Sequence, residues 1–372
     1  MRIGVPKEIK NQEYRVGMVP GLVRELTKRG HEVWVEHQAG AGIGFSDEDY
    51  LTVGARIADR PKGVFDAAEL IVKVKEPQGE ERTWLRPDHT LFAYLHLAPD
   101  PDQTAALLAS GATCIAYETV SDAQGGLPLL APMSEVAGRL AIQAGARGLE
   151  KSSGGAGILL GGIPGVEPAK VLILGGGTVG FNACQMAVGL GANVVVIDRS
   201  AVVLRRLDAH FESRVSTVYP SADALNRHLP DADLVIGAVL VPGAATPKLV
   251  TRSELRLLKP GSVLVDVAID QGGCFENSRP TTHDVPTFVD EGVVHYCVTN
   301  MPGVVPRTST FALNNATLPF VIAMASKGVM RAARDDPHLM DGLNIHRGML
   351  TERPVAEAQG RDYVPALDAI GA

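Results

Sequence analysis

The segment from residue 170 to residue 200 constrains the fold more than any other stretch of the chain. An apolar run at residues 171–174 is typical of a buried parallel strand and leads into a glycine-rich turn at residues 175–180, GGGTVG, which fits G-x-G-x-x-G. A helical segment to about Leu190 and a second β-branched strand at residues 193–197 follow. Asp198 ends this strand, close to the roughly 20-residue spacing expected for a ribose-binding acid. This order of strand, glycine-rich turn, helix, strand and acidic residue predicts a dinucleotide-binding βαβ unit.

Each part of this segment has a physical role in binding a dinucleotide. Gly175 permits a tight turn, Gly177 lets the backbone approach a pyrophosphate, and Gly180 allows the helix to pack close to the strand. Unpaired amides at the helix start attract the anion. Asp198 would accept hydrogen bonds from both ribose hydroxyls and repel a 2′-phosphate, which favours NAD over NADP. The alternative is a glycine-rich turn in an unrelated α/β protein.

The length and composition of the chain limit the classes of protein to which it can belong. A length of 372 residues suggests two domains, and the 45% hydrophobic and 21% charged residues are ordinary for a globular protein. The net charge of -7 argues against a general nucleic-acid or membrane-surface role. Four cysteines without C-x-x-C spacing predict reduced thiols in a cytoplasmic protein. We find neither a signal peptide nor an apolar run of the roughly 20 residues that a membrane helix needs.

The rest of the chain also alternates between strand and helix patterns. Strands are expected at residues 2–5, 70–75, 90–96 and 113–117 of the first third, which lacks a glycine fingerprint. Ser134 is expected to cap a long helix to residue 151, and residues 308–330 are mostly helical with a break or kink at Pro319. We therefore predict an α/β protein with two Rossmann-like domains, which contain doubly wound parallel sheets and are joined by long helices. Residues 1–128 and 307–372 form the substrate domain, and residues 129–306 form the NAD-binding domain.

Several candidate site residues directly follow predicted strands. Because ligands of open α/β sheets bind at the carboxyl ends of strands, we expect these residues to line a cleft between the domains, with cofactor and substrate on facing walls. The residues in such positions are Lys75, His96, Asp198, Leu240, Asp270 and Asn300.

Each candidate also has an ordinary interpretation. Lys73 and Lys75 could be solvated charges at a sheet edge, and Arg15 could be a surface arginine. His96 could be a packing residue, and Asp270 could cap a helix. The residues alone leave both interpretations open.

Over essentially its full length the chain resembles the NAD-dependent L-alanine dehydrogenases. The related transhydrogenase α subunits share the expected fold but are usually longer. The resemblance rests on the segments MRIGVPKEIKNQEYRVGMVP, LIVKVKEP, LFAYLHLA, LAPMSEVAGRLA, VLILGGGTVG, DLVIGAVLVPGA, VDVAIDQGGCFE, RPTTHD and ALNNATLPF.

The resemblance implies roles for individual residues. Arg15 and Lys75 would bind the carboxylate and carbonyl of the substrate, His96 would be the acid and base, and Asp270 would be the second catalytic residue. No metal ion is expected, because Lys327 stands where those members of the family that bind a metal have a histidine. Val203 and Pro220 depart from the residues that the family usually has there, and Ser221 stands next to Pro220. The cofactor-binding residues would be Ser134, Gly175, Gly177, Thr178, Val179, Gly180, Asp198, Ser221, Val239, Leu240, Val267, Ala268, Ile269, Asp270, Val298, Thr299, Asn300 and Met301.

The implied activity is reversible conversion of L-alanine, NAD and water to pyruvate, ammonium and NADH. The partners would be these small molecules and further copies of the chain, in a cytoplasmic homohexamer. One alternative is a related enzyme that acts on glycine and glyoxylate or on another small amino acid. Others are a transhydrogenase-like subunit and a non-enzymatic NAD(H)-binding module. The complete set of Arg15, Lys75, His96 and Asp270 favours the dehydrogenase.

Overall fold

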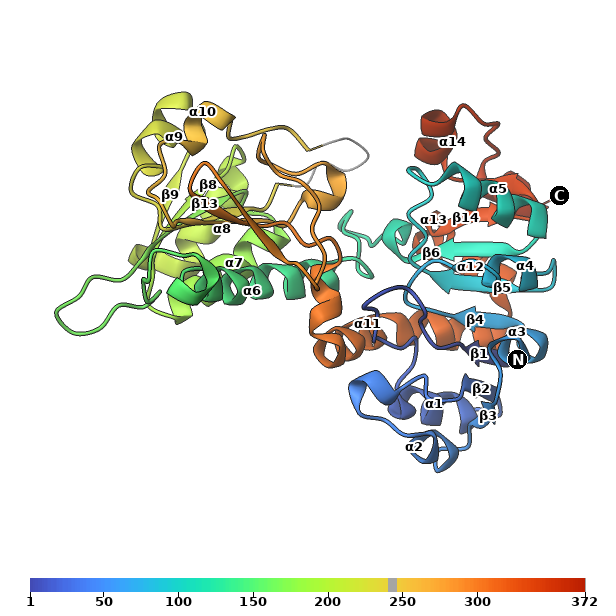
Figure 1. The fold of residues 1–372 in the computed structure, drawn as a ribbon. Coiled ribbons are helices and arrows are strands. Elements are labelled where there is room, and N and C mark those ends of the chain that lie inside the picture. The colour runs from blue at the N-terminus through green and yellow to red at the C-terminus, as the bar shows by residue number, and fades with distance from the viewer. Residues whose placement is uncertain (240–245, 372) are drawn as a thin grey trace. The chain divides into compact units, whose positions relative to one another are not determined.

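The chain forms two compact α/β units. The computed structural model describes residues 1–239 and 246–371 (Figure 1). Unit 1 comprises Met1–Met133 and Val305–Ala372, and unit 2 comprises Ser134–Val304. The first boundary therefore falls inside helix α6 (Ala131–Gly148), and the second lies directly before helix α11 (Pro306–Lys327). Within the described ranges, no helix has the length and apolar character needed to cross a membrane.

The sheet of unit 1 has the doubly wound order of a Rossmann-like domain. Its order is β15-β14-β6-β5-β4-β1-β2-β3, and β1 to β6 are all parallel. Strands β2 and β3 lie on one side of β1, and β4, β5 and β6 lie on the other side. The topological switch point is therefore between β1 and β4. The strands are β1 (Arg2–Val5), β2 (Glu32–Glu36), β3 (Arg56–Ala58), β4 (Leu70–Val72), β5 (Thr90–Ala93), β6 (Thr113–Ala116), β14 (Leu343–His346) and β15 (Met349–Leu350).

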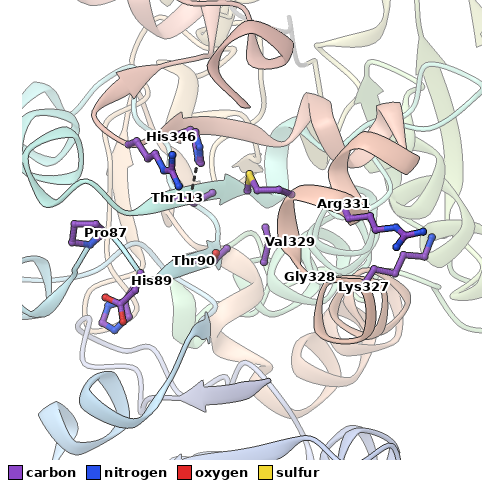
Figure 2. A pocket seen from close by; sticks show the side chains of 12 residues that line it. Pro87, His89, Thr90, Thr113, Lys327, Gly328, Val329, Arg331 and His346 are labelled. Carbon is purple, nitrogen blue, oxygen red and sulfur yellow. Dashed lines mark hydrogen bonds between the residues drawn. The ribbon is translucent and has the colours of Figure 1, made fainter. Parts of the chain in front are cut away.

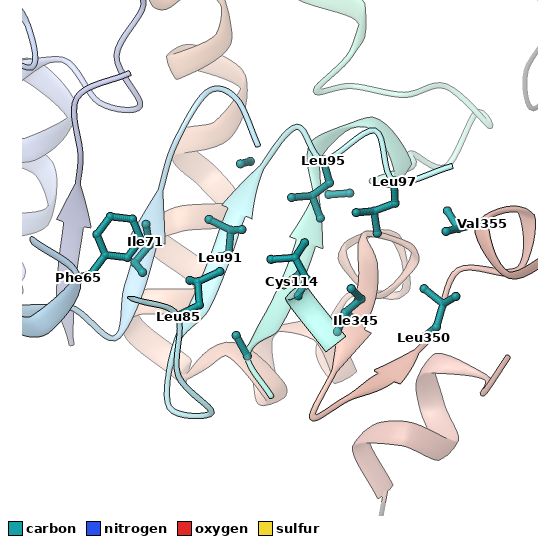
Figure 3. Close-up of a cluster of buried hydrophobic side chains, with 14 of the residues drawn as sticks. Phe65, Ile71, Leu85, Leu91, Leu95, Leu97, Cys114, Ile345, Leu350 and Val355 are labelled. Atoms are coloured by element: carbon teal, nitrogen blue, oxygen red, sulfur yellow. The ribbon is translucent and has the colours of Figure 1, made fainter. Parts of the chain in front are cut away.

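The central strands are short runs that are buried along their whole length. Strands β4, β5 and β6 have the sequences LIV, TLFA and TCIA, and every residue in them is buried. Such runs suit the middle of a parallel sheet, where both faces are covered. Figure 3 shows Leu91 and Cys114 from these strands in one cluster with Ile345, Leu95 and Leu97.

Helix starts in unit 1 follow ordinary capping chemistry. Proline occupies the first turn of several helices, where its missing N–H costs nothing, and Ser46 forms a capping box with Asp49 at α2. The helices are α1 (Pro20–Thr27), α2 (Asp47–Leu51), α3 (Pro61–Ala67), α4 (Glu81–Trp84), α5 (Pro101–Ser110), α11, α12 (Val329–Asp335), α13 (Pro337–Asp341), α14 (Arg353–Gln359) and α15 (Ala366–Gly371).

The last strands of unit 1 are antiparallel, which the prediction of purely parallel sheets did not include. Strand β14 pairs antiparallel with β6 and with β15. His346 pairs with Met349, so Arg347 and Gly348 form a two-residue turn, and both have positive φ, of 47° and 80°. Such a turn matches the twist of a hairpin and returns the chain at once. A parallel connection would need a crossover, for which this segment has no room.

The sheet of unit 2 has the same topology. Its order is β12-β13-β11-β10-β7-β8-β9, with parallel pairing throughout except for β12, which is antiparallel to β13. The switch point lies between β7 and β10. The strands are β7 (Lys170–Leu174), β8 (Asn193–Ile197), β9 (Val215–Val218), β10 (Leu234–Gly237), β11 (Val263–Asp266), β12 (Thr287–Asp290) and β13 (Val293–Tyr296), and the helices that begin in this unit are α7 (Thr178–Gly189), α8 (Ala201–Phe211), α9 (Ala222–His228) and α10 (Arg252–Leu255).

The structure differs from two predictions about the long helices. Helix α6 starts at Ala131, so Ser134 lies within its first turns and does not cap it. Helix α11 runs unbroken through Pro319. A proline inside a helix costs roughly 3 kcal/mol. Burial of Thr317, Val321 and Met324 in the same helix offsets this cost, so the break that the sequence suggested does not occur.

Gly180 gives a direct test of the packing in unit 2. A Cβ atom at this position would lie 1.7 Å from the main-chain oxygen of Gly175. Gly180→Ala should therefore lower the free energy of unfolding by about 1–3 kcal/mol, as measured by urea denaturation. Gly189→Ala in the same helix is the control, because a Cβ there meets no atom within 4 Å. Equal effects of the two substitutions would contradict the packing argument.

Candidate active site

The glycine-rich turn lies at the switch point of unit 2. Gly175 has a φ of 98°, and a Cβ atom there would lie 2.8 Å from the main-chain oxygen of Ala238 and from the side chain of Val239, which follow β10. Gly177 precedes helix α7 and is exposed, and a Cβ on it would meet no atom within 4 Å. The turn therefore leaves open space beside the amides that begin a 12-residue helix.

Asp198 is hydrogen-bonded to the same turn. Its Oδ2 accepts a hydrogen bond of 2.7 Å from the N–H of Gly176, and its Oδ1 accepts one of 2.7 Å from the N–H of Ser200. The carboxylate is thus fixed at the carboxyl end of β8, next to the glycines. These residues fit a dinucleotide, because an anion-binding helix start and a ribose-binding acid lie side by side.

Helix α6 brings Ser134 toward this region. A Cβ on Gly138 would lie 2.2 Å from the main-chain oxygen of Val179, so only glycine lets α6 approach α7 this closely. Arg139 of α6 donates hydrogen bonds to the side chains of Asn182 and Gln185 in α7. Ser134 lies about one helical turn before Gly138, near the start of α7.

The other predicted cofactor residues follow strands at the same edge of the sheet, because the strands concerned are parallel. Leu240 lies outside the described residues. Ser221 caps α9 and accepts a hydrogen bond from the N–H of Ala224. Some residues of this set have buried side chains, so that a ligand could contact only their main-chain atoms. These residues are Ala268, Ile269, Val298 and Met301. The set comprises Ser221 after β9, Val239 after β10, Val267, Ala268, Ile269 and Asp270 after β11, and Val298, Thr299, Asn300 and Met301 after β13.

A buried carboxylate holds the loop that carries Asp270. Asp266, at the end of β11, accepts hydrogen bonds from the N–H groups of Ala268 at 3.2 Å and Cys274 at 2.9 Å, and from the hydroxyl of Ser278 at 2.5 Å. Burial raises the pKa of Asp266, although these hydrogen bonds oppose the shift. Lys248 donates to three main-chain oxygens of the same loop. Asp270 itself is exposed.

Arg15 is buried at the switch point of unit 1. Its Nε and Nη2 atoms donate to the two carboxylate oxygens of Glu13 at 2.7 and 2.5 Å, and its Nη1 lies 3.1 Å from the sulfur of Met133. Burial alone would lower the pKa of Arg15, but the hydrogen bonds and charge of Glu13 outweigh burial and raise it. The ordinary interpretation of Arg15 as a surface residue is therefore excluded.

Lys75 is close enough to Arg15 for their charges to interact, and its neighbour in sequence, Lys73, is fully buried. Glu8, which follows β1, accepts hydrogen bonds from the N–H groups of Val74 at 2.7 Å and Lys75 at 3.3 Å, so it joins the ends of β1 and β4. Lys73 forms ion pairs with Glu8 at 3.4 Å and with Glu81 at 2.9 Å, and it is not the solvated edge charge that the sequence also allowed. Burial lowers the pKa of Lys75, and the positive charge of Arg15 adds to the shift.

His96 lies three residues beyond the end of β5, which is shorter than predicted. Its side chain is 49% exposed, and its backbone is left-handed, with a φ of 49°. The imidazole stacks on the ring of Tyr94, with centroids 5.8 Å apart and planes inclined by 6°. The N–H groups of Leu95 and His96 donate to Glu118, which follows β6, so these residues leave the sheet ladder.

Sequence reasoning missed the hydrogen bonds by which four carboxylates hold the predicted site residues. These carboxylates are Glu8, Glu13, Glu118 and Asp266. Glu8, Glu118 and Asp266 lie within about three residues of a strand end and Glu13 lies farther along the loop after β1, but no spacing rule says which main-chain groups such a carboxylate will meet. The one available signal was an acidic residue directly after an apolar strand, as at Glu118 and Asp266.

A cavity of about 370 Å³ in unit 1 lies at the opposite edge of the sheet (Figure 2). It is lined by Thr90 and Thr113, which begin β5 and β6, and by His346, whose Nδ1 lies 2.9 Å from the hydroxyl of Thr113. His96 and Glu118 follow the other ends of the same two strands. None of the predicted site residues lines this cavity.

The fold and the glycine-rich turn define a two-unit α/β protein with a dinucleotide-binding sheet. Two family models match the chain, "Alanine dehydrogenase/PNT, N-terminal domain" at residues 4–137 and "Alanine dehydrogenase/PNT, C-terminal domain" at residues 141–353. The chain therefore belongs to the alanine dehydrogenase/PNT family, which confirms the resemblance inferred from the sequence.

Individual relatives agree with this assignment. The alanine dehydrogenase of Halomonas elongata is 61% identical over 371 residues, which cover 100% of both chains. That of Bacillus subtilis is 53% identical, over 100% of this chain and 98% of the relative. A solved L-alanine dehydrogenase is 50% identical and superposes with a TM-score of 0.94 over 96% of this chain and 99% of its own. A transhydrogenase from Sinorhizobium meliloti, 23% identical over 95% of this chain and 99% of its own, shares the fold with a TM-score of 0.81.

Glu352, the residue before α14, gives a pH-dependent test of the electrostatics around Glu118. Burial, followed by the charges of Glu118 and Asp341, raises the pKa of Glu352 to about 7. Between pH 4.5 and 7 the unfolded carboxyl group loses its proton while the folded one keeps it, so rising pH favours the unfolded state. Glu352→Gln should therefore leave stability unchanged below about pH 4.5 and raise it at pH 8.

Urea denaturation of wild type and variant at pH 4.5, 6, 7 and 8 measures this difference. Glu357→Gln, which removes an exposed carboxylate from the same helix, is the matched control. A difference between Glu352→Gln and wild type that does not change with pH would contradict the shifted pKa.

Proposed function

We propose that this chain catalyses the reversible, NAD-dependent oxidative deamination of L-alanine to pyruvate and ammonium. The proposal rests on the full-length similarity together with the residues that lie at the two switch points. The chain aligns along its entire length with named alanine dehydrogenases, and it carries basic residues at one switch point and a dinucleotide fingerprint at the other. Arg15 and Lys75 follow β1 and β4 in unit 1, where ligands of such sheets bind.

Arg15 and Lys75 would bind the amino acid or keto acid. Glu13 accepts hydrogen bonds from Nε and Nη2 of Arg15 and so fixes the plane of the guanidinium group that would bind the substrate carboxylate. The lowered pKa of Lys75 makes its ammonium a better proton donor. Lys75 would polarise the carbonyl oxygen of pyruvate in the amination direction.

His96 and Asp270 would handle protons and water. An imidazole can both accept and donate a proton, and His96 would do so while water adds to the imine carbon and ammonia leaves. The carboxylate of Asp270 would orient that water and stabilise positive charge on the substrate nitrogen. NAD supplies the hydride acceptor when bound, and Gly177 and Asp198 would hold its pyrophosphate and ribose.

Assembly and location follow from the family resemblance. We infer a cytoplasmic homohexamer that uses no metal ion. The four cysteines are all unpaired, which is consistent with a reducing compartment.

An absorbance assay at 340 nm tests the function directly. Purified protein with pyruvate, ammonium and NADH should consume NADH, and L-alanine with NAD should produce it. Replacing pyruvate with glyoxylate tests the related amino-acid dehydrogenases, and faster turnover of glyoxylate would favour that alternative. Binding of NADH without turnover of any keto acid would instead support a non-enzymatic module.

Two substitutions test the catalytic assignments. His96→Ala and Asp270→Asn should each lower kcat by about 10²-fold or more, because each removes a group that acts in the transition state. The Kd of NADH, measured by fluorescence, should change little. Either assignment is wrong if the folded variant turns over at nearly the wild-type rate.

A further inference from the structure

Glu118 binds two consecutive main-chain N–H groups, those of Leu95 and His96. Its Oε1 atom accepts hydrogen bonds from the N–H of His96 at 2.6 Å and from the N–H of Leu95 at 3.1 Å. Only 16% of its side chain is exposed. Glu118 follows β6 and His96 follows β5, so this carboxylate joins the ends of two adjacent strands.

His96 needs such support because its backbone conformation is unfavourable. Its φ of 49° lies in the left-handed region, which residues other than glycine rarely adopt unless the surroundings impose it. The two N–H groups bound by Glu118 belong to consecutive residues, Leu95 and His96, and their hydrogen bonds hold the main chain where it enters this turn. The conformation of this turn also sets the direction of the Cα–Cβ bond of His96.

The imidazole ring is also oriented on two sides. Tyr94 stacks on one face, and its own hydroxyl is fixed by a 2.5 Å hydrogen bond to the main-chain oxygen of Leu129. The Nδ1 atom of His96 lies 3.9 Å from Oε1 of Glu118. The charges of Arg15 and Glu118 interact with the hydroxyl of Tyr94, and the carboxyl groups of Glu118 and Glu352 interact electrostatically with each other.

A carboxylate next to Nδ1 has a specific chemical effect. It favours the tautomer that carries its proton on Nδ1, and it stabilises the imidazolium that forms when Nε2 takes up a second proton. Nε2 is then the nitrogen that exchanges protons. The same arrangement, in which a third group orients the base, recurs in unrelated enzymes.

We propose that Glu118 is a positioning residue for His96, which fixes its turn and tautomer so that Nε2 exchanges protons with the substrate. The proposal rests on the proposed function, in which His96 is the acid and base. Glu118 acts through His96 and is not itself a catalytic residue.

Glu118→Gln separates the charge from the main-chain hydrogen bonds. The amide oxygen can still accept from both N–H groups, so the turn is kept while the negative charge is lost. We expect kcat to fall by about 10- to 100-fold, whereas the KM values for L-alanine and NAD stay within about two-fold of wild type. Glu118→Asp, which keeps the charge on a shorter side chain, should recover part of the lost kcat. Glu352→Gln removes a nearby carboxylate that does not contact His96 and should retain wild-type kcat.

The ring itself provides a readout that is independent of activity. In protein labelled with ¹⁵N-histidine, the His96 signal, assigned by its loss in His96→Ala, should show a proton on Nδ1. In Glu118→Gln the signal should move toward the tautomer with the proton on Nε2. An unchanged tautomer, or a folded Glu118→Gln enzyme with kcat within two-fold of wild type, would overturn the proposal. If Glu118→Gln does not fold, a Glu118→Asp enzyme with no recovered activity above that of Glu118→Ala overturns it.

These outcomes can be distinguished from failure of the proposed function. If wild-type protein shows no turnover, or if His96→Ala is as active as wild type, the function or the role of His96 is wrong. If His96→Ala is inactive and Glu118→Gln is fully active, only the role of Glu118 is wrong.

Discussion

Carboxylates that accept main-chain N–H groups hold the turns after the strands in both units. Glu8 joins the ends of β1 and β4, Glu118 joins those of β5 and β6, and Asp198 joins those of β7 and β8. Asp266 does the same within the loop after β11. These turns begin where the sheet ladder ends, so their N–H groups would otherwise have no partner. A charged acceptor gives the stronger hydrogen bond, and it fixes a side-chain position without adding length to the loop.

Burying such carboxylates costs free energy, and the structure offsets this cost in a different way at each of them. Glu8 and Glu81 both form ion pairs with Lys73, and all three side chains are buried; burial raises the pKa of Glu8, and the charge of Lys73 opposes that shift. Glu13 is neutralised by Arg15. Asp266 relies on three hydrogen-bond donors and has a raised pKa. Charge is therefore concentrated at the carboxyl ends of the strands, which is where substrate and cofactor are expected.

The sequence predicts those parts of the molecule that depend on local order. The glycine-rich turn, its flanking strands and Asp198 lie within about thirty residues and behave as their spacing indicates. Partners far apart in the chain are not predictable in this way. Glu8 meets Lys75 across 67 residues, and Glu118 meets His96 across 22 residues, only because of strand order. The hairpin of β14 and β15 was missed because its signal, Arg347-Gly348, is two residues long.

Unit 1 is built from both ends of the chain, with unit 2 inserted between them. On a ribosome the first 133 residues emerge without β14, the strand that covers the edge of β6. All of unit 2 is synthesised before that strand appears, so β6 keeps an open edge during more than 170 further residues of elongation. Exposed strand edges pair readily with other chains. The first 133 residues thus pass through a period in which this edge is open to association with other chains, until the C-terminal segment is made.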